Sequence, residues 1–435
     1  MSSTPKYSWI ILMFAVFLAM INQIDKILIG LVSVPLMKEL DLSASQWGLV
    51  GSSFYLFFTI TSILLGGMAD SKNPKKLFMW MSLIWLTVQF ATPFVSSFSL
   101  LILTRIILGA GEGPASPVVT TMLGKWFPKH RHGISYAAVL FGTMMGPAIA
   151  SPFLISMIDQ YGWKSVFVVM GIVGLIWLVF WVFYGKASPQ EIGLPSFDQV
   201  EQHSSTISKV PWRQFLPHLF SKNFILTVLA GGCAYWLVSV QSVWYPAYFS
   251  TVQQFSGQTL KLAVALPFLF AAFSQIGFAM LSDWLYRKTG DIRKARVNLA
   301  SFMMVLSAIC LYIGSAVNSS SISLLCFTLA PGFGIVMLSL APAILMDLFS
   351  PLNIGKAQGA YIALSNMGSM IAPLVFGYFI QYAATEALGY HYAFQASAVG
   401  MIIIGVLFWM GVRPAKRSHI TIKDKEDKED KEDAS

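Results

Sequence analysis

The chain alternates between long apolar stretches and short polar connections. We identify twelve apolar stretches of about 20 residues, the length that an α-helix needs to cross a bilayer core. They are centred near Val16, Phe58, Trp85, Ile107, Met145, Ile172, Val238, Phe270, Leu306, Gly334, Gly368 and Ile404. The stretches are continuously apolar rather than alternating, which argues against a membrane β-barrel. The pattern therefore predicts an all-α membrane protein with twelve transmembrane helices.

The composition supports this prediction. The 435 residues are 56% hydrophobic and 11% charged, whereas a soluble domain carries about 25% charged residues. The first stretch lacks a small-residue cleavage site and continues into residues 22–26, so we expect a retained helix rather than a signal peptide. Three cysteines, Cys233, Cys310 and Cys326, lie in apolar runs without metal or redox spacing and are interpreted as packing residues.

The net charge of +9 reflects membrane topology rather than nucleic-acid binding. Most Lys and Arg residues fall in alternate loops, and the opposite loops hold only Lys38, Lys164 and Lys261. By the positive-inside rule the basic loops and both termini are cytoplasmic. We therefore expect a multi-pass protein of the plasma (inner) membrane.

A long polar interruption divides the apolar stretches six and six. Residues 186–221 contain several prolines and a Ser-Ser pair, as expected for a cytoplasmic linker. We predict an N-terminal six-helix bundle over 1–185 and a C-terminal six-helix bundle over 222–413. Residues 414–435, with their repeated Lys-Glu-Asp, are predicted to be a disordered, charged tail.

Four charged residues interrupt the apolar stretches: Asp25, Lys26, Arg105 and Glu112. A charge at bilayer depth costs about 2.5–3.5 kcal/mol on insertion scales, so it persists mainly where it faces protein, water or a solute. Arg105 and Glu112 are seven residues apart, which puts both on one helical face about 10 Å apart. The first and fourth helices run in opposite directions, so we expect the four charges to meet in one water-filled cavity.

Several motifs resemble a known transporter family. They are Asn22-Gln-Ile-Asp25-Lys26, Arg105-Ile-Ile-Leu-Gly-Ala-Gly-Glu112-Gly-Pro-Ala-Ser-Pro117, Lys125-Trp-Phe-Pro128, Trp244-Tyr-Pro-Ala-Tyr248, and a degraded loop signature, Gly66-Gly-Met-Ala-Asp70 with Lys75-Lys76. Over about residues 8–412 the chain resembles the major facilitator superfamily and, within it, the organic anion:cation symporters, which include sugar-acid and aromatic-acid permeases and sialin relatives. The resemblance implies two pseudo-symmetric six-helix bundles that work by alternating access as one monomer.

The charges and the resemblance together favour a proton-coupled importer of small organic anions. Lys26 and Arg105, with Asn22 beside them, would bind the carboxylate, while Asp25 and Glu112 would take up protons. With both acids ionised the cluster is neutral, and with both protonated it is +2, so proton uptake attracts an anion. The alternative is a static network in which Arg105 and Asp25 merely join the first and fourth helices.

Further residues are candidates for binding or gating. Tyr235, Gln241 and Asn366 lie in the seventh and eleventh helices, where amide and phenol groups can bond a ligand or simply another helix. The resemblance implies that Asp70 and Asp283, at matching positions of the two halves, are gating contacts. Ordinary solvated helix ends are the alternative.

The substrate cannot be carried over from the family. Lys26 stands where arginine is usual and cannot make a bidentate fork to a carboxylate. Further departures at candidate pocket positions are Gln23, Thr59, Thr143 and Pro342. We therefore expect a small mono- or diacid, and both a sugar acid and an acid with fewer hydroxyl groups stay open.

Three other functions are alternatives. The first, a proton-driven antiporter exporting a drug or metabolite, is supported by Gly142-Thr-Met-Met-Gly146-Pro147 but lacks the glycine pair that usually follows. The second, an intramembrane enzyme, lacks a nucleophile with a base, metal-ligand spacing and a phosphate-binding loop, so we expect no catalysis, cofactor or metal. The third, a solute sensor with the shape of a transporter, stays open.

Overall fold

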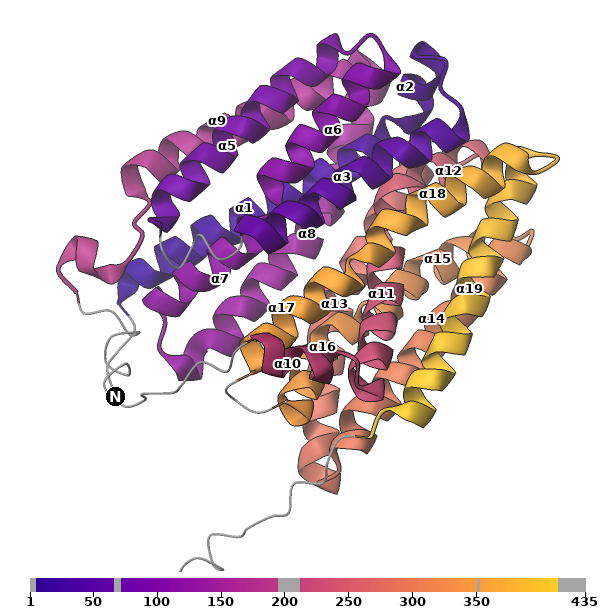
Figure 1. The fold of residues 1–435 in the computed structure, drawn as a ribbon. Helices are drawn as coiled ribbons and strands as arrows, with labels where there is room; N and C mark the ends of the chain where they lie inside the picture. The colour runs from indigo at the N-terminus through magenta and orange to yellow at the C-terminus, as the bar shows by residue number, and fades with distance from the viewer. Residues whose placement is uncertain (1–4, 66–71, 195–211, 350–352, 414–435) are drawn as a thin grey trace, which may run out of the picture.

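The computed structural model describes residues 5–65, 72–194, 212–349 and 353–413, and these residues are almost entirely helical (Figure 1). The first half contains α1 (Lys6–Leu31), α2 (Ser33–Glu39), α3 (Ala44–Leu65), α5 (Pro74–Ala91), η1 (Thr92–Phe94), α6 (Phe98–Glu112), α7 (Ala115–Trp126), α8 (Lys129–Tyr161) and α9 (Lys164–Tyr184). The connection holds η2 (Pro189–Ile192) and α10 (Trp212–Leu219). The second half contains α11 (Lys222–Val243), α12 (Tyr245–Thr251), α13 (Gly257–Thr289), η4 (Arg293–Asn298), α14 (Leu299–Ala316), α15 (Ser320–Gly334), α16 (Val336–Leu348), α17 (Ile354–Ser365), α18 (Met367–Tyr382) and α19 (Glu386–Gly411).

The prediction of twelve membrane-spanning helices is confirmed. Within the described residues, twelve helical segments are long and apolar enough to cross a bilayer, and each contains one of the twelve predicted centres. Helices suit this environment because they satisfy their backbone hydrogen bonds internally. The predicted charged tail, 414–435, lies outside the described residues.

Several spans are broken at positions that the two halves share. The fourth span breaks between α6 and α7 at Gly113–Pro114, and the tenth breaks between α15 and α16 at Ile335. The short helices α2 and α12 likewise follow the first helix of each half. These repeats agree with the predicted pseudo-symmetry.

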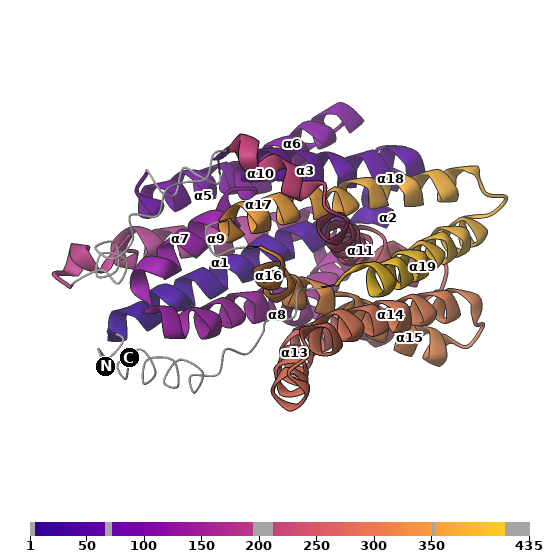
Figure 2. The same cartoon turned by 60° about the horizontal axis from the view of Figure 1, so that its bottom comes forward.

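The two halves lie side by side in both views (Figures 1 and 2). Across their boundary α3 packs against α18, α8 against α13, and α1 against α11. The Oγ of Ser52 on α3 donates a 2.6 Å hydrogen bond to the carbonyl oxygen of Met370 on α18. The halves therefore meet through helix surfaces rather than through loops.

Glycines bring the halves together at the end of the molecule that carries α2 and α12. A β-carbon on Gly48 would lie 2.5 Å from the carbonyl oxygen of Pro373, and one on Gly30 would overlap the carbonyl oxygen of Ser242. Both neighbours are backbone atoms of the opposite half. We call Gly30 and Gly48, with their partners Ser242 and Pro373, the glycine contact. Small residues of this kind permit close helix approach in membranes.

At the same end of the second half, large aromatic side chains form a compact cluster. Ring centroids of Phe327 on α15 and Phe394 on α19 are 4.8 Å apart, and those of Phe376 on α18 and Phe394 are 5.0 Å apart. Tyr248 on α12 joins them at 5.0 Å from Phe394. Trp244 packs against Phe376 and is 1% exposed, so it acts as a packing residue here. We call these rings the aromatic cluster.

An ion pair ties α2 to the connection between α8 and α9. The indole Nε1 of Trp163 donates a 2.6 Å hydrogen bond to Glu39, and Lys164 Nζ lies 3.0 Å from the other carboxylate oxygen. This hydrogen bond, with the neighbouring lysine, holds the pKa of Glu39 below its ordinary value.

Candidate functional site

Glycines fix the position of α6, which carries Arg105 and Glu112. A β-carbon on Gly109 would overlap the carbonyl oxygen of Phe54 on α3, and one on Gly113 would overlap that of Phe58. Small residues at these positions therefore let α6 lie backbone to backbone against α3. Both charged side chains of α6 are buried.

The structure brings the four charged residues together. Asp25 and Arg105 are 2% exposed, Glu112 is fully buried, and Lys26 is partly buried. Asp25 interacts electrostatically with Arg105 and Lys26, and Lys26 interacts with Glu112. Among the described residues, however, no ion pair joins two of these four. The predicted convergence of the four side chains is observed, whereas a direct Arg105–Asp25 ion pair is not. Glu112 lines neither of the two cavities described below, so the predicted single cavity shared by all four charges is not observed either.

Each charged group instead has neutral neighbours. Gln89 on α5 donates a 2.6 Å hydrogen bond from Nε2 to Asp25. Lys26 Nζ donates a 2.9 Å bond to the Oδ1 of Asn22 and lies 4.6 Å from the ring centroid of Phe58. The positive charge of Lys26 is therefore partly compensated by the side-chain dipole of Asn22 and the ring face of Phe58.

Arg105 and Glu112 retain unused hydrogen-bonding capacity. Nε and Nη2 of Arg105 and both carboxylate oxygens of Glu112 are buried without a hydrogen-bond partner. Buried polar atoms are nearly always paired, so an unpaired group needs a partner such as water, an ion or a ligand. Arg105 thus keeps donors that a solute can use, whereas Glu112 has the side chain of Asn22 beside it.

A small cavity adjoins the cations. It has a volume of about 10 Å³, and its polar or charged lining comes from Asp25, Lys26, Arg105 and Tyr55. The rest of the lining is Ile29, Val50, Gly51, Phe54 and Val243. We call this space the cation cavity. Val243 belongs to α11, so the cavity lies where the two halves meet.

A second cavity lies on the other side of Asp25. It also measures about 10 Å³ and is enclosed by α1, α5 and α9 within the first half. Ser82, Trp85 and Gln89 contribute its polar groups, and Leu18, Ile21, Leu86, Met170, Gly174 and Trp177 complete the lining. We call it the rear cavity. The sequence interpretation did not identify these polar residues, although Gln89 is the only glutamine in its apolar stretch.

The candidates from the second half do not line either cavity. Gln241 is 3% exposed and its Nε2 has no hydrogen-bond partner. Asn366 is 5% exposed and sits at the break between α17 and α18. Tyr235 is partly buried, and its carbonyl oxygen accepts a hydrogen bond from Ser369. Their predicted contact with a ligand remains a prediction.

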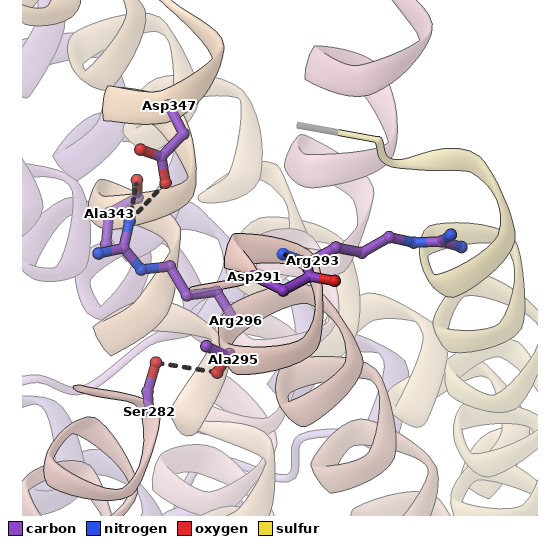
Figure 3. Close-up of polar contacts among 7 residues, drawn as sticks. All are labelled: Ser282, Asp291, Arg293, Ala295, Arg296, Ala343 and Asp347. Carbon is purple, nitrogen blue, oxygen red and sulfur yellow. Dashed lines mark hydrogen bonds and ion pairs between the residues drawn. The ribbon is translucent and has the colours of Figure 1, made fainter. Parts of the chain in front are cut away.

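The predicted gating residues lie at helix ends or outside the described part of the chain. Asp70 falls outside the described residues, and Asp283 is exposed near the end of α13. Close to Asp283, Arg296 of η4 forms an ion pair with Asp347 of α16 and donates a 3.0 Å bond to the carbonyl oxygen of Ala343 (Figure 3). Ser282 donates to the carbonyl oxygen of Ala295 (Figure 3). The ends of α13, η4 and α16 are thus tied together.

Comparison with solved structures supports this fold. A bacterial homologue of the human lysosomal transporter Spinster, in an inward-facing and occupied conformation, superposes with a TM-score of 0.77 at 15% identity. The match covers 96% of this chain and 100% of that one. At this identity the likeness concerns the fold alone.

Sequence comparison gives the family. The Major Facilitator Superfamily profile matches residues 12–341 and 295–432. A probable sulfoacetate transporter of Cupriavidus necator is 31% identical over 83% of this chain and 84% of its own length. A hexuronate transporter of Bacillus subtilis is 25% identical over 86% and 88%. The chain belongs to the Major Facilitator Superfamily and is a multi-pass membrane protein. Because the family and these relatives are transporters, the prediction of a transporter rather than an enzyme is confirmed.

Proposed function

We propose that this protein is a proton-coupled secondary transporter that imports a small organic anion by alternating access. One observation carries the proposal: two cations and two carboxyl groups lie close together inside the membrane-spanning region without forming ion pairs with one another. Such groups are costly at this depth and mark solute or proton pathways. The names of the relatives, a sulfoacetate and a hexuronate transporter, support an anionic substrate.

The roles follow from charge balance. Lys26 and Arg105 bind the anion, with Asn22 orienting the lysine, while Asp25 and Glu112 take up protons. When both acids are ionised the cluster has no net charge, and when both are protonated it carries +2. A bound anion neutralises the cations and so favours the protonated acids. This mutual effect is the coupling free energy that a symporter needs.

The same charge balance favours a small dianion as substrate. A cluster of charge +2 is neutralised by two negative groups, and the two cations offer one partner to each. The apolar lining from Ile29, Val50, Phe54 and Val243 offers no hydrogen bonds to sugar hydroxyls. A dicarboxylate or a sulfonated carboxylate such as sulfoacetate meets both conditions.

The second half completes the site when the transporter changes state. In this proposal Tyr235, Gln241 and Asn366 reach the anion from the opposite half, and Asp70 and Asp283 form contacts that close the cytoplasmic side. The chain divides into bundles at 1–185 and 222–413, joined by a cytoplasmic linker at 186–221. It works as a monomer in the plasma membrane with both termini in the cytoplasm.

The test replaces one carboxyl group by its neutral isostere. Glu112→Gln should abolish accumulation driven by an inward proton gradient in proteoliposomes yet preserve counterflow exchange, which needs no net proton movement. Glu386→Gln, at the exposed start of α19, is the matched control and should behave as the unmodified protein. Gradient-driven uptake that survives Glu112→Gln would remove Glu112 from the mechanism.

The same vesicles test proton-driven export. The glycines that suggested an antiporter pack α8 against α1, because a β-carbon on Gly142 would lie 2.7 Å from Val16 and one on Gly146 would lie 2.9 Å from Met20. Close packing is therefore a sufficient reason for this motif. Efflux of a cationic solute on imposing the gradient would favour export instead.

A further inference from the structure

Asp25 lies between two cavities of different character. On one side is the cation cavity, where Lys26 and Arg105 lie. On the other is the rear cavity, whose lining comes from α1, α5 and α9 and includes no residue of the second half. Asp25 is the one residue common to the two linings. The carboxyl group of Asp25 can therefore contact the two cations that bind the anion on one side and a different partner on the other.

The rear cavity contains unpaired polar atoms. Ser82 Oγ, Trp85 Nε1 and Gln89 Oε1 are all buried without a hydrogen-bond partner, and the three residues are 2%, 5% and 3% exposed. Gln89 is held in place because its Nε2 donates to Asp25. Trp177, which also lines the cavity, is already satisfied, since its Nε1 donates to the carbonyl oxygen of Phe14 at 3.2 Å. The unpaired atoms therefore gather on the side of the cavity formed by α5.

The chemistry of these atoms fits one water molecule. The indole of Trp85 can only donate, the Oε1 of Gln89 can only accept, and the Ser82 hydroxyl can do either. A water molecule satisfies such a mixture, whereas a metal cation would meet the positive end of the indole N–H. The volume of about 10 Å³ is the smallest that holds a single water, and two to four polar partners are what a buried water requires.

We propose that the rear cavity binds a water molecule through which Asp25 exchanges its proton. The carboxylate of Asp25 takes a proton from a hydronium ion in the rear cavity, which leaves a neutral water there, and the reverse transfer releases the proton. Protons and the anion thus reach Asp25 from opposite sides, so bound substrate does not block proton exchange. This inference rests on the proposed proton coupling.

The experiment removes the water's partners without touching Asp25. Ser82→Ala/Trp85→Phe removes two hydrogen bonds to the water, each worth about 0.7–1.4 kcal/mol, so proton-driven uptake in proteoliposomes should slow by about 10- to 100-fold. Counterflow at constant pH should stay within about twofold, because it needs no proton exchange. The control is Ser151→Ala. Ser151 is a buried serine of α8 whose Oγ donates to the carbonyl oxygen of Pro147. This substitution should leave the ratio of uptake to counterflow unchanged.

An experimental structure at a resolution that shows ordered water provides an independent readout. Density within hydrogen-bond distance of Ser82 Oγ and Gln89 Oε1 supports the proposal, and a dry rear cavity overturns it. Equal losses of uptake and counterflow, or no loss of either, also overturn it. If uptake by the unmodified protein does not depend on the proton gradient, the proposed function fails as well. If that uptake is proton-driven but the double variant is unaffected, only the water route fails.

Discussion

The glycine contact predicts that one added methyl group will drive the two halves apart. In Gly48→Ala the new β-carbon would lie 2.5 Å from the carbonyl oxygen of Pro373 and 3.1 Å from its carbonyl carbon. Both are backbone atoms of α18 and cannot rotate away. To reach an ordinary van der Waals distance, α3 and α18 must separate locally by about 1 Å.

The free-energy cost of this added methyl group shifts the populations of the conformational states. Overpacking a well-packed contact costs about 1–3 kcal/mol, which corresponds to about a 5- to 150-fold shift against the state with this end closed. Gly277→Ala is the matched control, because a β-carbon there meets no atom within 4 Å. Both substitutions favour helix formation equally, so only the contact across the boundary differs.

Spin-label distances provide the assay. Labels at Lys38 on α2 and at Ser256, the N-cap of α13, report the separation at this end by double electron–electron resonance. Gly48→Ala should increase the population at long distance and lower counterflow exchange, whereas Gly277→Ala should do neither. Distance distributions that are identical in both variants would refute the reasoning, since the close approach would then not exist in a populated state.

Three further predictions concern charged residues. Arg105→Lys should weaken binding of a carboxylate by about 10- to 100-fold, as judged by ligand-induced thermal shift, because a lysine cannot reproduce the arginine's fork. Arg296→Met should lower unfolding stability by about 3–5 kcal/mol, because it leaves the largely buried Asp347 unpaired, and adding Asp347→Leu should restore much of the loss. The melting temperature should fall as the pH drops below about 4.5, the ordinary pKa of a glutamate side chain. The pKa of Glu39 is lower in the folded protein, so its ionised form stabilises the fold and protonation removes that stabilisation. Glu39→Gln should reduce this acid sensitivity, and an unchanged melting curve would argue against the Trp163 hydrogen bond.

The spans could be predicted from the sequence because the bilayer imposes a length and a polarity that each helix must satisfy by itself. The breaks after Gly113 and near Ile335, and the short helices α2 and α12, were not predicted. They interrupt or extend apolar runs without changing their hydropathy. Hydropathy therefore misses them, although Pro114 at the break and Pro246 at the start of α12 are local signals.

The four charges of the site could be predicted because a charge stands out in an apolar run. Their neighbours could not. Gln89 and Phe58 are ordinary residues in membrane helices, and their contacts with Asp25 and Lys26 depend on how α1, α3 and α5 pack. The rear cavity was missed for the same reason, because its existence depends on three helices at once.

The aromatic cluster bears on how this protein can move. Its rings come from α12, α15, α18 and α19 and are interlocked at centroid distances near 5 Å, so none can change rotamer without displacing its neighbours. We therefore expect that region to turn as a stiff block. The first half holds a stack of the same kind, in which Phe14, Phe78 and Trp177 surround Trp181 at centroid distances of 5.4–5.6 Å, so two stiff blocks leave the helix surfaces between them as the place where the molecule can yield.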